Sequence, residues 1–315
     1  MDRRPLRWKY NQMTTPLTIE YVDSAHEARR WRDQGYCPIE CAFGEESVVD
    51  ALQMDHHGTM GDLEGVAVRA CRDHYGARKA DPRFVVAGAA DADATLAIAG
   101  LAGLLLPTQP TGPSTGPAAG SQTFLPLAEL VSQVDVNPIG LRLEESENGR
   151  RVLLFKRLAS GAQDATAFHA GVDCWRLLCG PRVPRALLAA VAEEEALRVR
   201  QARSAVVECL GDAVALVESE VWGYDVWYAE IRPVIVAFVA GQNRVSIGCR
   251  DVATAARLFG PGGLGNVFPK LQPPGWGGRG TIGGSPRGAR LTREEARAIA
   301  QQVAALAASP KSISA

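Results

Sequence analysis

The 315-residue sequence has no apolar segment long enough to cross a membrane. Its longest apolar run, residues 94–106, contains 13 residues and two glycines, whereas a membrane-spanning helix needs about 20 apolar residues. No apolar core follows the basic residues 1–9 either, so the sequence shows no secretory signal. We therefore expect a cytoplasmic protein that makes no contact with a membrane.

The sequence also lacks an excess of charge of either sign. Its 34 lysines and arginines nearly balance 35 aspartates and glutamates, which leaves a formal net charge of −1 at pH 7. No overall field therefore attracts nucleic acid or an anionic membrane. A nucleotide or short oligonucleotide suits this balance better than long nucleic acid, whose binding requires several phosphate contacts. The sequence is compatible with a homodimer and does not identify the oligomeric state.

The cysteines do not form the pattern of a disulfide framework, because they are odd in number and scattered. Cys37 and Cys41 have a spacing that could ligate zinc, but no second pair accompanies them, so buried structural thiols are the favoured interpretation. A Walker loop, a dinucleotide fingerprint and a G-x-S-x-G elbow are also absent from the sequence. The seven cysteines are Cys37, Cys41, Cys71, Cys174, Cys179, Cys209 and Cys249.

The length predicts two domains, because 315 residues exceed what one hydrophobic core usually supports. In residues 1–183, strand-like segments alternate with helix-like segments, which predicts an α/β domain with a parallel sheet. Residues 107–122 are mostly small residues and proline, and are expected to form a flexible surface loop. Strands are expected at 17–22, 48–54 and 83–87, helices at 24–34, 62–75, 94–106 and near 125–133, and a turn at 144–149.

Residues 184–204 have the composition and spacing of a helix and are expected to connect the two domains. Residues 205–315 are then predicted to form a smaller α+β domain. Thr292 and Glu295 make a capping box, which predicts that a last helix begins there and extends to about residue 308. The expected strands lie at 205–208, 213–218, 226–231, 235–240 and 244–248, with a hairpin loop at 240–243 and a helix at 251–259.

Three adjacent side chains with metal-binding chemistry follow the apolar run 48–54. Asp55, His56 and His57 cannot all point into a core, because successive residues of a strand face opposite ways and buried unpaired groups are costly. Asp91 and Asp93 follow the next predicted strand, and ligands gather beyond the carboxyl ends of parallel strands. The pattern predicts a site for Mn²⁺ or Mg²⁺. The alternative is a loop in which one side chain caps a helix and the others are solvated.

Such a cluster suits phosphoester chemistry. Two divalent ions a few ångströms apart activate a water molecule and bind both the attacking and the leaving oxygen of a phosphate ester. Several carboxylates are needed to neutralise two dications. Asp135 stands in an apolar context before a proline, and is either a further ligand or a turn residue. Asp73 and His74 are more simply explained as a solvated pair, and the surroundings of His169 match no zinc-finger spacing.

A glycine-rich segment near the C-terminus is the candidate substrate-binding loop. Glycines let backbone N–H groups approach a phosphate closely, and arginine adds a planar, charged donor. The alternative is a tight connection in which glycine only turns the chain. Trp276 could stack on a base, although a lone tryptophan is more often a packing anchor. The candidate substrate-binding residues are Arg279, Gly283, Gly284, Ser285, Arg287 and Gly288.

The triplet Asp55-His56-His57 resembles the signature of the DHH phosphoesterase superfamily, which includes RecJ-type nucleases, oligoribonucleases, cyclic-dinucleotide phosphodiesterases and inorganic pyrophosphatases. Residues 84–97 resemble that family's Asp-rich metal motif, and residues 283–288 resemble the glycine-rich substrate loop of the associated DHHA1 domain. The resemblance covers residues 45–105 and 205–308.

The resemblance implies an Mn²⁺- or Mg²⁺-dependent phosphoesterase in which Asp55, His56 and His57 are catalytic and bind the metal with Asp91 and Asp93. In the family the Asp-rich motif precedes the triplet, whereas here it follows. Either the first domain is rearranged, or the first motif is degenerate. In the second case the candidates for its lost ligands are Asp23 and His26. The alternative function is a non-catalytic nucleotide-binding or regulatory protein with an incomplete metal site.

Overall fold

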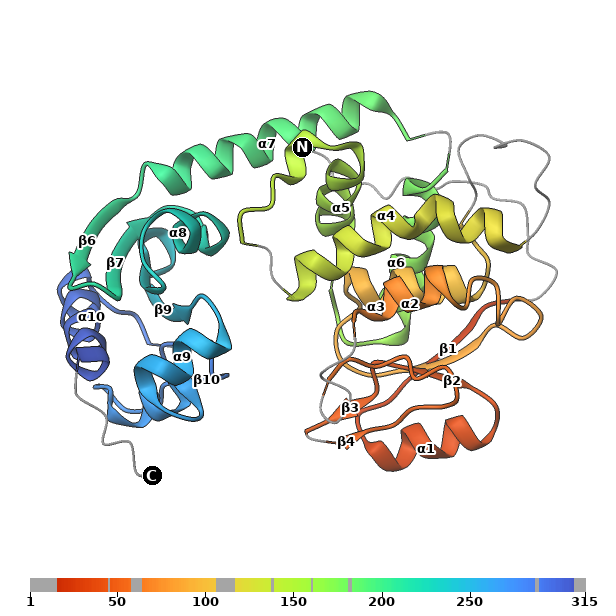
Figure 1. The fold of residues 1–315 in the computed structure, drawn as a ribbon, viewed down its shortest axis with the longest axis horizontal. Helices are drawn as coiled ribbons and strands as arrows, with labels where there is room; N and C mark the ends of the chain where they lie inside the picture. The colour runs from red at the N-terminus through yellow and green to blue at the C-terminus, as the bar shows by residue number, and fades with distance from the viewer. Residues whose placement is uncertain are drawn as a thin grey trace. The chain divides into compact units, whose positions relative to one another are not determined.

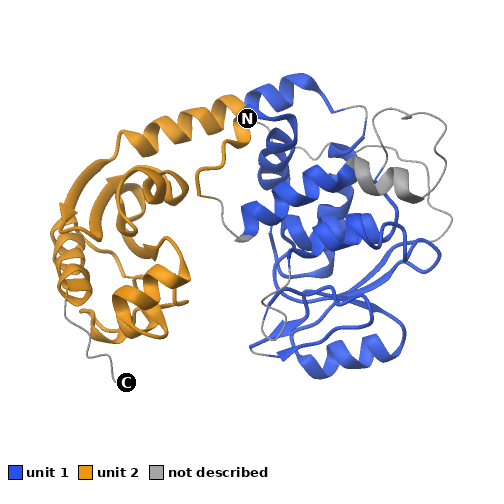
Figure 2. Ribbon diagram, in the orientation of Figure 1, with its two compact units in different colours: residues 1–137, 145–191 blue, residues 138–144, 192–315 orange. Residues whose placement is uncertain are grey.

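The chain divides into two compact units, which Figure 2 shows in different colours. Unit 1 contains residues 1–137 and 145–191, and unit 2 contains residues 138–144 and 192–315. The division falls inside helix α7 (Arg185–Arg203), where the sequence predicted a helix at 184–204. The computed structural model describes residues 16–44, 46–57, 64–105, 117–136, 139–159, 161–180, 183–286 and 289–308.

Unit 1 contains a three-stranded parallel sheet of order β1-β5-β2, formed by Thr18–Tyr21, Arg83–Val86 and Cys37–Ile39. The central strand β5 is completely buried at Phe84, Val85 and Val86. Its unbroken apolar run is typical of a parallel strand that is covered on both faces. In Figure 1, α1 (Ala25–Asp33) lies on one side of the sheet, and α2 (Val66–Arg72) and α3 (Ala92–Leu101) lie on the other.

Four helices of unit 1 begin directly after a side chain that caps them. Ser24, Asp91, Ser146 and Asp164 each accept a hydrogen bond from a backbone N–H in the first turn of a helix. The central helix is α3, which is buried along its whole length from Asp93 to Leu101. The other helices are α2 (Val66–Arg72), α4 (Pro117–Val136), α5 (Glu147–Leu158) and α6 (Ala165–Leu178), and the short strands are β3 (Ala42–Phe43) and β4 (Glu46–Ser47). The short helix η2 (Leu143–Glu145) crosses the boundary between residue 144 of unit 2 and residue 145 of unit 1.

Helix α6 packs closely against α3. Trp175 is fully buried, stacks on Phe155 with ring centroids 4.5 Å apart, and donates its indole N–H to Thr95 Oγ1 at 3.1 Å. Gly171 faces Thr95, and a Cβ atom at residue 171 would lie only 2.6 Å from the Thr95 methyl carbon. The missing side chain therefore sets the short distance between the two helices.

The predicted strand at 48–54 is wrong. These residues form a turn and an irregular segment, and the strand that pairs with β5 is β2, which the sequence analysis did not predict. Asp50 Oδ1 accepts a hydrogen bond from Leu52 N at 2.8 Å, and Gln53 has a φ of 54°, so the segment cannot stay extended. Of its apolar residues, Val48 and Met54 are buried although they do not pair in the three-stranded sheet.

Two other local predictions in unit 1 are also wrong. The polar turn expected at 144–149 contains η2 and the first residues of α5, since Ser146 caps that helix. The loop expected at 107–122 ends earlier than predicted, because α4 begins at Pro117, and a proline is well suited to a first helical position. The rest of that loop, residues 107–116, lies outside the described residues.

Unit 2 contains a six-stranded mixed sheet of order β10-β11-β9-β8-β7-β6, in which only β7 and β8 pair in parallel. The expected hairpin between β8 and β9 is present, with Asn243 in the left-handed conformation at φ 50°. The capping box is also confirmed, because Thr292 N donates to Glu295 Oε2 at 2.7 Å and Glu295 N donates to Thr292 Oγ1 at 3.2 Å. The strands are β6 (Val206–Leu210), β7 (Val214–Ser219), β8 (Val234–Val239), β9 (Arg244–Cys249), β10 (Gly277–Gly278) and β11 (Ile282–Gly284); the helices are α8 (Tyr224–Glu230), α9 (Val252–Phe259) and α10 (Arg293–Ala308).

The strand predicted at 226–231 is wrong, because this segment belongs to helix α8. A connection between the parallel strands β7 and β8 has to cross over the sheet, and a helix does so. Trp227, a residue of this helix, is fully buried in the core and donates its indole N–H to Ala202 O at 2.9 Å. In the part of the chain that the structure describes, no helix has both the length and the apolarity of a membrane span.

Candidate metal centre

The candidate site lies beyond the carboxyl ends of two strands of the unit 1 sheet. Strand β2 ends at Ile39 and Glu40 follows directly, while Asp91 follows β5 after a short loop. The segment with Asp55 is tied to the same edge, because Glu40 N donates to Met54 O at 2.8 Å. Acidic and imidazole groups therefore gather where ligands of parallel sheets usually bind.

The imidazole of His56 stands among three carboxylates. Its Nε2 atom lies 3.0 Å from Glu40 Oε1, 3.5 Å from Asp135 Oδ2 and 3.8 Å from Asp93 Oδ2. The side chains of His56 and Glu40 are only 5% and 6% exposed, and Asp93 is completely buried. Asp135, on α4, is 37% exposed and is the carboxylate of this group that solvent reaches.

His57 is held by Asp55. The buried Asp55 Oδ1 accepts the backbone N–H of His57 at 2.9 Å and lies 3.2 Å from its ring Nδ1. This hydrogen bond is the main cause that raises the pKa of His57, against the effect of burial. The ring meets that of His56 edge-on, with centroids 4.4 Å apart. Asp55 thus orients His57 and leaves Nε2 of that ring available to a ligand.

Glu40, His56 and His57 form a group that could hold a metal ion. Each offers one ligand atom, and these atoms all lie within 4.8 Å of one another. Within the described residues this is the group of histidine, cysteine and carboxylate side chains that meets such a criterion. Two imidazoles and a carboxylate are a ligand set that transition-metal ions such as Mn²⁺ and Zn²⁺ accept.

Three polar atoms of this site are buried without a hydrogen-bond partner. They are Glu40 Oε1, Asp55 Oδ2 and His56 Nε2. Glu40 Oε1 and His56 Nε2 are close, yet the contact does not have the geometry of a hydrogen bond. Buried polar atoms in folded proteins are nearly always satisfied. Unpartnered ligand-type atoms from three neighbouring side chains are what a metal-binding site leaves when only protein atoms are counted, so the residues fit a divalent ion.

The buried carboxyl groups of Glu40, Asp91 and Asp93 resist ionisation, because burial raises the pKa of each. Burial, reinforced by Asp91 and Asp93, holds the pKa of Glu40 well above its usual value. Burial likewise raises the pKa of Asp91, and raises that of Asp93 to about 6 although His56 opposes the shift. A cation bound among these groups would favour their ionised forms and so reverse the direction of these shifts.

Asp91 and Asp93 also begin two helices. Asp91 Oδ1 caps α3 by accepting from Ala94 N at 3.0 Å. Asp93 accepts from Val66 N at 2.8 Å and from Ala67 N at 3.2 Å, and so caps α2 from outside that helix. The sequence analysis considered helix capping as an alternative role for Asp55, His56 and His57. In the structure it is Asp91 and Asp93 that cap helices. A carboxylate oxygen has two acceptor positions, so each oxygen of Asp93 can still bind a cation.

Of the five predicted ligands, only His56 and His57 belong to the group whose ligand atoms converge. Asp93 lies 3.8 Å from His56 and Asp55 lies 3.2 Å from His57, while the described hydrogen bond of the Asp91 side chain is the cap of α3. The structure adds Glu40, which sequence reasoning missed, and it places Asp135, which that reasoning left undecided, beside His56. Asp23 is exposed after β1, and His26 lies in α1; neither belongs to the group whose ligand atoms converge. The sequence signal that could have identified Glu40 is the short apolar segment 37–39, which this acidic residue follows directly.

The glycine-rich segment belongs to unit 2. Some of its residues have packing roles, as expected of a tight connection, and others have the free space or exposure that a substrate-binding loop needs. A Cβ atom at Gly283 would lie 2.2 Å from the Phe268 ring, so this glycine is required for packing. Gly284 has free space beside it, since its Cβ would meet nothing closer than 3.9 Å. Ser285 is buried with an unpartnered hydroxyl, and Arg279 is exposed. Arg287 and Gly288 lie outside the described residues, and Trp276 is only 8% exposed, as a packing anchor is.

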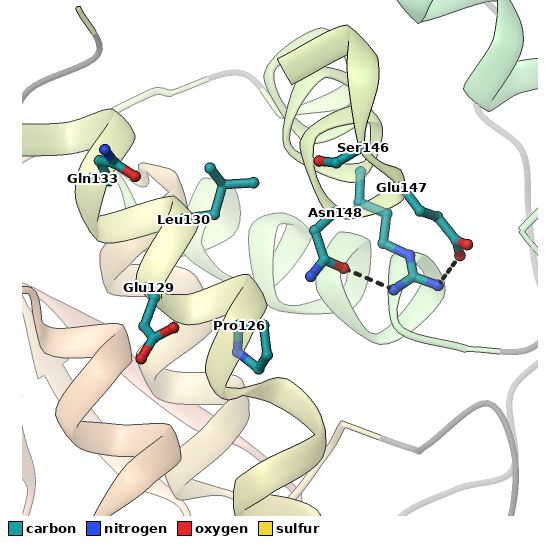
Figure 3. A pocket seen from close by; sticks show the side chains of 8 residues that line it. Pro126, Glu129, Leu130, Gln133, Ser146, Glu147 and Asn148 are labelled. Atoms are coloured by element: carbon teal, nitrogen blue, oxygen red, sulfur yellow. Dashed lines mark hydrogen bonds and ion pairs between the residues drawn. The ribbon is translucent and has the colours of Figure 1, made fainter. Parts of the chain in front are cut away.

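A cavity of about 580 Å³ lies between α4 and α5 (Figure 3). Arg151 bonds there to Glu147 and Asn148, as the dashed lines show. None of the clustered side chains lines this cavity, so it is separate from the candidate metal centre. Its lining residues are Pro126, Glu129, Leu130, Gln133, Ser146, Glu147, Asn148 and Arg151.

Comparison with known proteins adds no relative: the chain matches no protein-family model, no curated protein and no solved structure.

Proposed function

We propose that unit 1 binds a divalent metal ion, preferably Mn²⁺, and that the protein is a metal-dependent phosphoesterase acting on a nucleotide or short oligonucleotide. The observation that carries the proposal is the set of unpartnered buried atoms on Glu40, Asp55 and His56. The two imidazoles favour Mn²⁺ over Mg²⁺, which prefers oxygen ligands.

Each residue of the cluster has a separate role in this proposal. Glu40, His56 and His57 would hold the ion, while Asp55 fixes the ring of His57 through Nδ1. A bound divalent ion supplies a Lewis acid that polarises a phosphoryl oxygen and activates water for attack on phosphorus. Asp135 is exposed at the edge of the cluster, so its carboxylate is the group placed to take up a proton from an incoming water or substrate.

Phosphoester hydrolysis is proposed rather than another metal-dependent reaction for two reasons. The Asp55-His56-His57 triplet and the later Asp pair resemble the motifs of the DHH phosphoesterases. Several carboxyl groups also surround one imidazole, and a bound divalent ion of the kind used in phosphoester hydrolysis would favour their ionised forms. In unit 2, Arg279 is exposed and Gly284 has free space beside it, so both are candidate phosphate contacts.

The metal-binding part is tested by calorimetry with Mn²⁺ on the metal-free protein. We expect Mn²⁺ to raise the unfolding midpoint, because an ion that binds only the folded state stabilises it. Glu40→Gln combined with His56→Ala should abolish the effect. His74→Ala is the matched control, since His74 lies outside the cluster, and it should respond as the wild type does. Equal stabilisation of the double variant would refute the site.

The catalytic part is tested by assays with Mn²⁺ on p-nitrophenyl phosphate esters, dinucleotides, trinucleotides and cyclic dinucleotides. We expect turnover of at least one of these, with kcat lowered by orders of magnitude in Asp55→Ala because the orientation of His57 is lost. Binding of Mn²⁺ without turnover of any ester would refute the hydrolase and favour a non-catalytic binding protein.

A further inference from the structure

Arg69, on α2, is a buried arginine that binds three backbone carbonyls. Its side chain donates from Nε to Glu64 O at 3.1 Å, from Nη2 to Asp55 O at 2.7 Å, and from Nη1 to Gln53 O. The residue is 8% exposed. A buried arginine more commonly pairs with a carboxylate, whereas each described hydrogen bond of Arg69 ends on the main chain.

The three acceptors lie on both sides of the metal-binding triplet. Gln53 precedes the triplet, and Asp55 is its first residue. Glu64 comes after the triplet and is the first described residue after residues 58–63. Gln53 has a left-handed backbone with φ 54°, which costs free energy for a residue with a side chain. One planar guanidinium therefore fixes the chain on either side of the ligands and holds a strained residue in place.

The anchored carbonyl of Asp55 connects Arg69 to the imidazoles. The carboxylate of Asp55 orients His57 through its backbone N–H and its ring, and the ring of His57 packs edge-on against His56. A shift of the Asp55 backbone would move both rings. Arg69 itself is not one of the residues whose ligand atoms converge.

We propose that Arg69 is a positioning residue of the metal centre, which holds Asp55, His56 and His57 in the geometry that binds a divalent ion. This inference rests on the proposed metal site and names the residue that assembles it. Arginine is required because its three nitrogens lie in one plane and reach three separate carbonyls, while the single nitrogen of lysine cannot span them.

The test compares wild type with Arg69→Lys and Arg69→Met by calorimetric titration of the EDTA-treated proteins with Mn²⁺. We expect Arg69→Met to weaken Mn²⁺ binding by about 10- to 100-fold, the loss typical of residues that orient metal ligands, and Arg69→Lys to lie between Met and wild type. Arg72→Gln is the control, since Arg72 lies on the same helix but is 43% exposed and bonds to carboxylates. It should bind Mn²⁺ as wild type does.

A second measurement needs no metal. Hydrogen exchange of the His57 amide, which bonds to Asp55 Oδ1, should accelerate at least tenfold in Arg69→Lys, while amides of α1 keep their protection. If Arg69→Met does not fold, Arg69→Lys decides both readouts. Unchanged Mn²⁺ affinity together with a lowered melting temperature would mean a purely structural role and overturn the inference, as would unchanged exchange of the His57 amide. A wild type that binds no Mn²⁺ refutes the proposed function instead.

Discussion

In the metal-free protein, Asp93 should make unit 1 less stable as the pH rises from about 4 to about 6. Burial is the main cause that raises the pKa of this carboxyl to about 6 in the folded state, from 3.8 for an unperturbed group. Between these two pH values the folded chain holds a proton that the unfolded chain has released. The stabilisation from Asp93 is therefore complete below pH 3.8 and is lost as the pH rises through about 6.

The size of the effect follows from the difference of about two pKa units, which corresponds to about 3 kcal/mol of unfolding free energy. Asp93→Asn removes this titration. It also disturbs the cap of α2, because one of the two N–H donors from Val66 and Ala67 would face the amide nitrogen of asparagine. That loss does not depend on pH, so it shifts the whole curve of the variant without changing its shape.

The assay is urea unfolding in EDTA at several pH values between 4.5 and 7, followed by tryptophan fluorescence. We expect the stability of wild type minus that of Asp93→Asn to fall by about 2 kcal/mol across this range, because about 1 kcal/mol of the total is already lost below pH 4.5. A difference that stays constant would show that Asp93 is already ionised in the folded protein, and the reasoning would be wrong. The increase in unfolding free energy on adding Mn²⁺ should become larger as the pH rises over the same range, because the ion binds ionised carboxylates.

Three further substitutions test the packing around the site. Trp175→Phe should lower the unfolding free energy of unit 1 by about 1–3 kcal/mol, measured by urea denaturation, because Thr95 Oγ1 loses a buried donor. Gly171→Ala should cost about 1–3 kcal/mol, since its Cβ would press on Thr95; an unchanged midpoint would mean that α6 moves away freely. Thr292→Ala should destabilise unit 2 by about 1 kcal/mol through loss of the capping box with Glu295, and Mn²⁺ affinity by titration should stay unchanged.

Local sequence signals predicted most of the helices, while strands depended on partners elsewhere in the chain. Ser24 and Thr292 cap helices whose starts could be read from a few neighbouring residues. The segments 37–39 and 48–54 are both apolar, and only pairing with β5 decides that the first is the strand. The segment 226–231 is largely apolar, as a buried strand would be, but it belongs to helix α8 because it connects two parallel strands.

The candidate site could be predicted in part for the same reason. Asp55, His56 and His57 are adjacent, so their shared chemistry is visible in the sequence alone. Glu40 was missed because its position depends on β2 and on a left-handed backbone with φ 50°, neither of which a local pattern specifies. Asp135 comes from α4, and its distance from His56 is fixed by the packing of that helix.

The spread of these residues along the chain has a consequence for synthesis on the ribosome. Strand β1 pairs with β5, which is made much later, and the group around His56 includes residues from Glu40 to Asp135. The full set of carboxylates cannot assemble until α4 has left the ribosomal tunnel, because contacts between distant segments form only after the chain between them exists. A nascent chain halted before Asp135 should therefore hold Mn²⁺ less tightly than the finished protein, and tight binding of Mn²⁺ would mark the moment at which α4 has packed beside His56.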